Sequence, residues 1–126
     1  MTLATLILAL AMVESNLDPL AIGDGGQAWG ILQIHKCVIE DVNNFCGTNY
    51  KSEDRWDPEK SYKICELYLN HWGKRYQDKT GYPPNAEAYA KIWNGGPNGW
   101  KKTGEVGKKL DRYWAKVQTK IAKILQ

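Results

Sequence analysis

Histidine and phenylalanine are scarce in this sequence, with two His and one Phe among 126 residues. Neither His35 nor His71 falls in the spacing of a known zinc-ligand motif, so we expect no metal site and no cofactor. The sequence also lacks an apolar run of the roughly 20 residues that a bilayer-spanning helix requires. These absences argue against zinc-dependent chemistry and against insertion into a membrane.

The first 35 residues contain no Lys or Arg. No positive charge therefore precedes the apolar run Leu3–Val13, which argues against a signal peptide although Ala9-Leu10-Ala11 imitates a cleavage site. We interpret the run as a buried core helix that is apolar on all sides. An export signal is then missing from this sequence, or the protein leaves its cell by another route, such as a phage holin.

Cysteine is present in an odd number, at Cys37, Cys46 and Cys65. This count is compatible with two alternatives. Either two cysteines form a disulfide and the third is a free thiol, or all three are buried thiols. A Cys37–Cys46 bond is disfavoured if the segment between them is helical, because its ends would lie roughly 13 Å apart. Cys65, on the next predicted helix, could reach either of the other two.

Positive charge is concentrated at the end of the chain. Residues 36–99 carry nine basic and nine acidic side chains, whereas residues 100–126 carry eight basic and two acidic ones. Apolar residues recur there at helical spacing from Leu110 to Leu125, which predicts an amphipathic helix with a solvated basic face. We expect no nucleic-acid partner, because no zinc finger, RNA-recognition signature or phosphate-cradling loop accompanies the basic residues.

The fold class predicted from the pattern is mainly α, with a small irregular or hairpin segment. A length of 126 residues indicates one domain, over residues 1–126, that can bury a core without disulfides. Asp57-Pro58 and Asn85 are typical helix starts. The expected helices cover residues 2–16, 37–44, 57–76, 85–93 and a stretch of 100–126. Residues 17–34 are expected to form a short ribbon or turn, and Gly47–Trp56 a polar loop.

Glu14 is the residue with the clearest chemical potential. It closes the apolar helix Leu3–Val13, and apolar surroundings disfavour the charged form of a carboxyl, so we expect a raised pKa for Glu14. A carboxyl that keeps its proton near neutral pH is the general acid that a glycosidase needs for the leaving-group oxygen. An exposed Glu at a helix end is the structural alternative.

Three short motifs occur in order along the chain: Val13-Glu14-Ser15, then Trp29-Gly-Ile-Leu-Gln33-Ile, then Ala90-Lys-Ile-Trp93-Asn94-Gly-Gly. Together they resemble the Glu-Ser, Gly-Leu-Met-Gln and Ala-Tyr-Asn motifs of the lytic transglycosylase and goose-type lysozyme family. Two departures are present. Ile31-Leu32 is a volume-conserving replacement for Leu-Met, and Trp93, whose indole only donates, stands where the family has a Tyr hydroxyl.

The resemblance implies a lysozyme-like fold, in which a buried central helix delivers its acid into a cleft between a helical and a smaller lobe. It implies that Glu14 protonates the β-1,4 bond between N-acetylmuramic acid and N-acetylglucosamine in peptidoglycan. Ser15, Gln33, Trp93 and Asn94 then fall on substrate-binding or orienting positions. The alternatives are backbone satisfaction for Ser15, a surface ribbon position for Gln33 and a helix C-cap for Asn94.

Asp24 decides the reaction class that the resemblance implies. Gly23-Asp24 leading into Gly30 resembles the goose-type stretch in which an Asp positions the hydrolytic water, while His35 occupies the second acidic position of that stretch. A lytic transglycosylase needs no such base, because the muramic acid C6 hydroxyl attacks and leaves a 1,6-anhydro end. The structural alternative for Asp24 is a turn residue before two glycines.

Other functions remain open at this point. The same fold could cleave chitin-type polymers, or the chain could be a catalytically idle wall-binding module. Retention of Glu14, Gln33 and Asn94 together argues against the idle module. The expected partner is the peptidoglycan glycan strand, bound by a monomer that is secreted, periplasmic or phage-delivered, and the basic helix also suits the anionic cell wall.

We predict that Trp93 contributes to substrate binding or to the cleft wall rather than to proton transfer. Trp93→Phe should keep most lytic activity, because an aromatic ring remains at the position. Trp93→Ala should lose both packing and sugar stacking, which a turbidity assay on cell walls and a wall-binding assay would detect. Normal binding and cleavage by the Ala variant would show that the third motif is misaligned.

Overall fold

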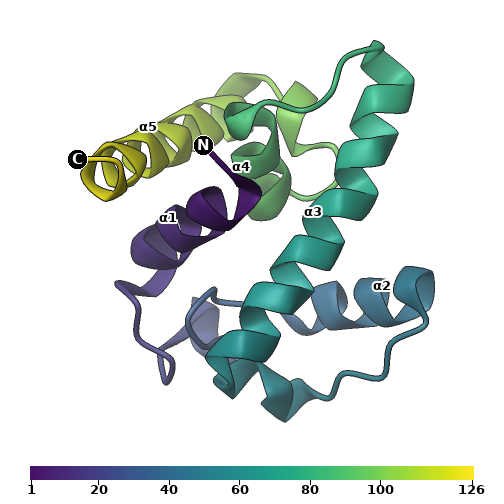
Figure 1. Cartoon of the computed structure of the whole chain (residues 1–126), viewed down its shortest axis with the longest axis vertical. Coiled ribbons are helices and arrows are strands. Elements are labelled where there is room, and N and C mark those ends of the chain that lie inside the picture. The colour runs from purple at the N-terminus through teal and green to yellow at the C-terminus, as the bar shows by residue number, and fades with distance from the viewer. The chain divides into compact units, whose positions relative to one another are not determined.

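The computed structural model describes all 126 residues and contains five helices and one two-stranded sheet (Figure 1). The helices are α1 (Leu3–Ser15), α2 (Lys36–Cys46), α3 (Pro58–Thr80), α4 (Ala86–Gly95) and α5 (Gly104–Ile124). The strands are β1 (Ile22–Gly23) and β2 (Ala28–Trp29), and 3₁₀ turns cover η1 (Asp24–Gly26), η2 (Ser52–Trp56) and η3 (Gly99–Lys101). No helix is both long and apolar enough to cross a bilayer.

The chain divides into two compact units, which are described separately. The terminal unit comprises Met1–Ala9 and Leu69–Gln126, and the central unit comprises Leu10–Tyr68. Helices α1 and α3 each contribute residues to both units. The single domain and the cleft between lobes that the sequence predicts stay predictions.

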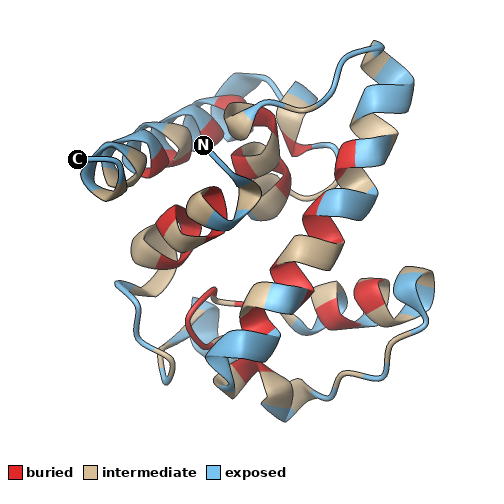
Figure 2. Cartoon of the chain, in the orientation of Figure 1, coloured by how far each residue is buried: buried red, intermediate tan, exposed pale blue.

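In the terminal unit, α4 packs against α5 and the turn η3. The contact is close because Gly95 faces the Leu110 side chain, where an added Cβ would lie 2.9 Å from Leu110 Cδ1. Helix α5 buries one stripe, made of Gly107, Leu110, Tyr113 and Val117, and most of its other residues are exposed (Figure 2). The predicted amphipathic helix is therefore confirmed.

Both predicted helix starts are confirmed. Asn85 Oδ1 accepts a hydrogen bond from the Ala88 amide at 2.8 Å, which caps α4. Asp57 Oδ1 accepts one from the Lys60 amide at 3.3 Å, and Pro58 is the first residue of α3. Such side-chain caps satisfy amides that the helix itself leaves unpaired.

In the central unit, the predicted ribbon is an antiparallel hairpin. Ile22 pairs with Trp29 and Gly23 with Ala28. Trp29 also forms a bridge with Ile34, two residues before α2 begins. The turn η1 between the strands holds Asp24, Gly25 and Gly26 at φ values of 49°, 63° and 95°, a region that favours Gly and tolerates Asp. The Gly-rich composition thus supplies the turn.

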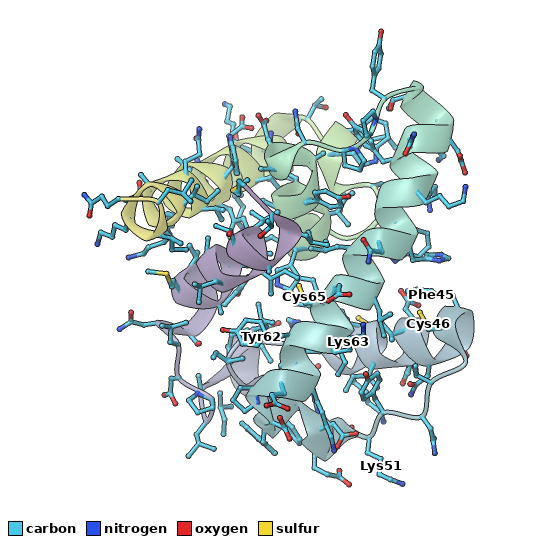
Figure 3. All side chains as sticks on the ribbon, viewed as in Figure 1. Phe45, Cys46, Lys51, Tyr62, Lys63 and Cys65 are labelled. Carbon is cyan, nitrogen blue, oxygen red and sulfur yellow. The ribbon has the colours of Figure 1, made fainter.

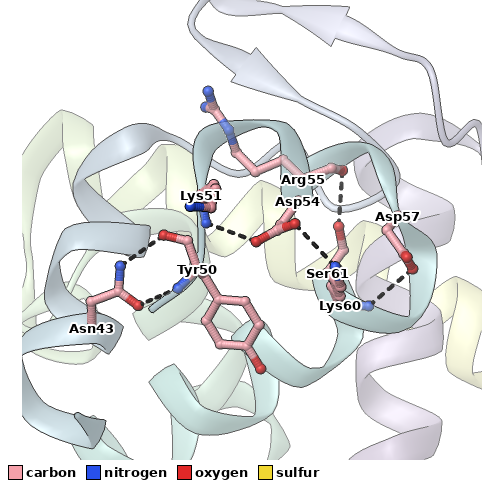
Figure 4. A network of polar contacts seen from close by, with 8 residues as sticks. All are labelled: Asn43, Tyr50, Lys51, Asp54, Arg55, Asp57, Lys60 and Ser61. Atoms are coloured by element: carbon pink, nitrogen blue, oxygen red, sulfur yellow. Dashed lines mark hydrogen bonds and ion pairs between the residues drawn. The ribbon is translucent and has the colours of Figure 1, made fainter. Parts of the chain in front are cut away.

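The segment expected as a polar loop, Gly47–Trp56, has more order than predicted. The Asn43 side chain binds the backbone of Tyr50 twice (Figure 4). Its Nδ2 donates to the Tyr50 carbonyl at 2.9 Å, and its Oδ1 accepts from the Tyr50 backbone N–H at 2.9 Å. The Lys51 amide donates to Asp54 Oδ2 at 2.7 Å, which starts the turn η2. The Asn43 side chain therefore supplies the backbone hydrogen bonds that order the start of this segment, which has no helix or strand.

The three cysteines are all free thiols, so the disulfide alternative does not hold in this structure. Cys65 on α3 is buried, whereas Cys37 and Cys46 on α2 are exposed, which corrects the alternative of three buried thiols (Figure 3 labels Cys46 and Cys65). Burial is the main cause that raises the pKa of the Cys65 thiol well above its ordinary value. Cys65 therefore acts as a small hydrophobic side chain.

Arg55 in η2 is buried, with 4% of its surface exposed. Its Nη1 donates to the backbone carbonyls of Ile34 at 2.9 Å and Gln27 at 3.2 Å. Its Nε donates to the backbone carbonyl of Ser52 at 2.9 Å. Its guanidinium carbon lies 3.9 Å from the centre of the Trp29 ring. Burial lowers the pKa of Arg55, but a guanidinium stays charged in proteins.

We predict that Arg55→Met lowers the free energy of unfolding by at least about 2 kcal/mol, because buried carbonyls lose their donors. The matched control is Arg112→Met on the exposed face of α5, where the change should stay within about 0.5 kcal/mol. Urea unfolding measures both. Equal midpoints for the two variants would contradict the role given to Arg55.

Candidate functional site

Glu14 is the last but one residue of α1 and is half-buried. The preceding turn includes Leu10 and Ala11, both of which are buried. The Glu14 carboxylate lies close enough to Cys65 on α3 to add to the rise in the pKa of that buried thiol. Glu14 therefore lies at the end of an apolar helix and near the buried Cys65 thiol of the same unit. The raised pKa expected for Glu14 itself stays a prediction.

Ser15 fixes the end of α1 to the second motif. Its Oγ donates to the Ile31 carbonyl at 2.7 Å and lies 3.3 Å from the Ala11 carbonyl. The same oxygen accepts a hydrogen bond from the Asp18 amide at 3.0 Å. One hydroxyl thereby joins the helix that carries Glu14, the turn that follows it and the Gly30–Gln33 turn. This is the backbone-satisfying role that the sequence left as the alternative for Ser15.

The Gln33 side chain joins the two residues that flank the hairpin. Its Nε2 donates to the carbonyls of Ala21 at 3.1 Å and Gly30 at 3.0 Å. Its Oε1 lies so close to Gly23 that a Cβ there would sit 2.2 Å from it. Gln33 itself has a φ of 52°, in the left-handed region. Both donors of the amide are thus directed at the hairpin backbone, and a sugar-binding role for Gln33 stays a prediction.

Asp24 and His35 form a pair that links the hairpin turn to the start of α2. His35 Nε2 lies 2.6 Å from Asp24 Oδ2, a distance at which the imidazole N–H donates to the carboxylate. The side chains are 70% exposed for Asp24 and 42% exposed for His35. The contact orients an exposed carboxylate without removing it from solvent. The sequence placed His35 at the second acidic position but did not predict this contact.

Two tryptophans, Trp29 on β2 and Trp56 at the end of η2, stack on each other. The rings of Trp29 and Trp56 stack with centroids 4.8 Å apart and planes 15° apart. The Trp29 indole donates to the Gly26 carbonyl at 2.7 Å, which fixes its orientation. Trp56 also lines an open hollow of about 920 Å³ together with acidic side chains of the same segment, Glu53, Asp54, Asp57 and Glu59. The sequence analysis assigned sugar stacking to Trp93 and did not single out Trp29 and Trp56.

The third-motif residues belong to the terminal unit, in α4. Trp93 is half-buried and Asn94 is exposed. The helix continues to Gly95, and its C-cap is Gly96, whose φ is 85° and whose amide donates to the Ile92 carbonyl. Asn94 therefore lies in the last turn rather than at the C-cap that the sequence left as its alternative. Glu14, Ser15, Asp24 and Gln33 all lie in the central unit.

Comparison with known proteins gives consistent matches. Residues 1–115 match the family model of the transglycosylase SLT domain. The lysozyme of Magallana gigas is 34% identical over 92 residues, which cover 64% of this chain and 64% of that protein. The lysozyme of Meretrix lusoria is 32% identical over 93 residues, which cover 65% of this chain and 72% of that protein. The chain thus spans slightly less than two thirds of the Magallana gigas protein.

Among solved structures, the crystal structure of Tapes japonica lysozyme matches with a TM-score of 0.71 at 24% identity. The match covers 90% of this chain and 86% of that chain. At this identity the likeness concerns the fold, and it confirms the predicted fold class, a mainly helical lysozyme-like fold with a small hairpin.

Proposed function

The chain belongs to the transglycosylase SLT domain family, and we propose that it is a glycosidase that cleaves peptidoglycan. The bond is the β-1,4 link between N-acetylmuramic acid and N-acetylglucosamine, and Glu14 is the general acid. The lysozyme names of the two relatives support a glycosidase of this kind. The substrate places its site of action at the cell wall.

The observation that carries the proposal is the way in which Glu14 is held. Its helix is apolar up to Val13, and the next residue, Ser15, bonds to the Ile31 carbonyl at 2.7 Å. The acid is thereby fixed with respect to the Gly30–Gln33 turn of the second motif. A general acid must be positioned within hydrogen-bond reach of the leaving oxygen. A helix end that is fixed in place holds the acid at that position better than a mobile one.

The reaction begins when the Glu14 carboxyl transfers its proton to the glycosidic oxygen. The bond between that oxygen and C1 of the muramic acid then breaks, and the leaving sugar departs with a new hydroxyl. Water attacks C1 in a hydrolase and gives a free reducing end. In a transglycosylase the C6 hydroxyl of the same sugar attacks instead, its proton returns to the Glu14 carboxylate, and a 1,6-anhydro ring results.

The contact between Asp24 and His35 favours the hydrolytic course. A base for water must keep an accessible oxygen, and the Asp24 side chain is 70% exposed while one of its oxygens is held by His35 Nε2 at 2.6 Å. Such a carboxylate can receive a proton from the attacking water. Transglycosylation is the second candidate, because the left-handed φ of 49° at Asp24 also suits a purely structural turn residue.

We predict that Glu14→Gln abolishes wall lysis and leaves the fold intact. The substitution is nearly isosteric but removes the transferable proton, and general acid catalysis contributes about 10²–10⁴-fold. Zymography on cell walls measures lysis, and circular dichroism checks the fold. Activity within about threefold of the wild type, with an unchanged fold, would contradict the assignment of Glu14.

The reaction class is tested by the products. If Asp24 acts on water, muropeptides released from purified sacculi carry free reducing ends, and Asp24→Asn lowers turnover at least about tenfold, since a base is lost. Mass spectrometry separates these products from the anhydro form, which is lighter by one water. Predominantly anhydro products with a mild effect of Asp24→Asn would reject the hydrolase and leave the role of Glu14 standing.

A further inference from the structure

Five basic side chains form one stripe along α5: Lys109, Arg112, Lys116, Lys120 and Lys123. Their spacings of three and four residues place all five within an arc of about 80° at 100° per residue. The stripe runs for about 21 Å at 1.5 Å per residue. Four of the five are exposed and Lys120 is half-buried, on the helix face that Figure 2 shows largely in pale blue. We refer to these five residues as the basic stripe.

None of the five takes part in an ion pair. The two acidic residues of α5 are already engaged with other cations, Glu105 with Lys108 at 3.5 Å and Asp111 with Lys91 at 2.7 Å. Glu105 lies on the same face, one turn before Lys109, but its carboxylate is paired with Lys108, so no acid of α5 forms an ion pair with the stripe. Like charges three and four residues apart on a helix repel one another weakly, and a bound polyanion would relieve this repulsion.

The stripe offers charge to a partner, and no apolar side chain lies within its arc. Leu110, Tyr113 and Val117 are buried in the terminal unit and are not available to a lipid bilayer. No aromatic side chain lies within the arc of the stripe, and single-stranded nucleic acid is bound through aromatic stacking as well as charge. A linear polyanion without bases or acyl chains is the partner that fits these features.

We propose that the basic stripe binds the phosphodiester polymer of the cell wall, a flexible chain of polyols joined by phosphates. Such a polymer presents single negative charges at short regular intervals, as the stripe presents cations about every 5 Å along the helix. The proposal rests on the proposed function for its biological setting, because that activity brings the protein to the wall. The contact itself requires no cleavage and does not involve Glu14 or Asp24.

The test measures binding of soluble poly(glycerol phosphate), free of glycan, by titration calorimetry at a series of NaCl concentrations. Lys116→Gln with Lys123→Gln should weaken binding at least about tenfold and reduce the salt slope by about two, since one counterion is released per phosphate contact. Lys116→Arg with Lys123→Arg should bind as the wild type does. Both exchanged positions are exposed, and Lys, Arg and Gln are all good helix formers, so the fold is expected to persist.

The matched control is Lys63→Gln with Lys74→Gln on α3, which removes the same net charge from exposed lysines paired with Glu66 and Asp78. We expect binding within about twofold of the wild type, because these cations lie outside the stripe. An equal loss in both double variants would overturn the proposal in favour of net charge alone. Absence of polymer binding would overturn it as well.

Two further probes decide between classes of partner. Single-stranded DNA of the same phosphate number, and vesicles of anionic phospholipid, should bind more weakly than poly(glycerol phosphate). Equal or tighter binding of either probe would overturn the proposal. Glu14→Gln separates this proposal from the enzymatic one, because it should abolish lysis and leave polymer binding unchanged. A wild type that binds the polymer but cannot lyse walls would overturn only the proposed function.

Discussion

A buried cation without a carboxylate partner organises the central unit. Burying a charge is costly unless hydrogen bonds replace the lost water, and Arg55 is 4% exposed. Its compensation is three backbone carbonyls and the face of the Trp29 ring. These partners come from the hairpin, from the entry to α2 and from η2, so each segment must keep its place for the charge to be tolerated. Arg suits this position because its planar fork can serve several acceptors at once.

The backbone carbonyl of Arg55 also constrains the segments that position Glu14, the candidate acid. Its carbonyl accepts from Ser61 Oγ at 2.9 Å and lies so close to Gly30 that an added Cβ would sit 2.0 Å from it. Gly30 also needs its φ of 84°, so no other residue fits the turn. The turn after Gly30 then presents the Ile31 carbonyl to Ser15. Glu14 is thus positioned by a chain of contacts that begins at a residue in a different segment.

Local features of the fold were predictable from the sequence, whereas contacts between distant segments were not. Asn85 and Asp57 act as caps because a cap depends on residues within one turn. Arg55 gave no signal, since a basic residue in a polar loop normally points to solvent. Asn43 and Ser15 likewise act on backbone groups that only the folded chain brings near. The three motifs identified the family and include Ser15 and Gln33, whereas Arg55 and Asn43 lie outside them.

The candidate site follows the same division. Glu14 was identifiable because an acid at the end of an apolar run is visible in the sequence, and Asp24 because Gly23-Asp24 leading into Gly30 resembles the goose-type stretch. What the structure adds is the difference between their surroundings, since Glu14 is half-buried near the Cys65 thiol while Asp24 is mostly exposed beside His35.

Two carboxyl groups in unlike environments are what a glycosidase needs to separate an acid from a base. His35 is then more than a missing acidic residue. An imidazole that donates to one oxygen of Asp24 holds the carboxylate in place and leaves the other oxygen for water. A second carboxylate at that position would instead repel it. The replacement of an acid by His35 is therefore compatible with hydrolysis that uses a single carboxylate as base.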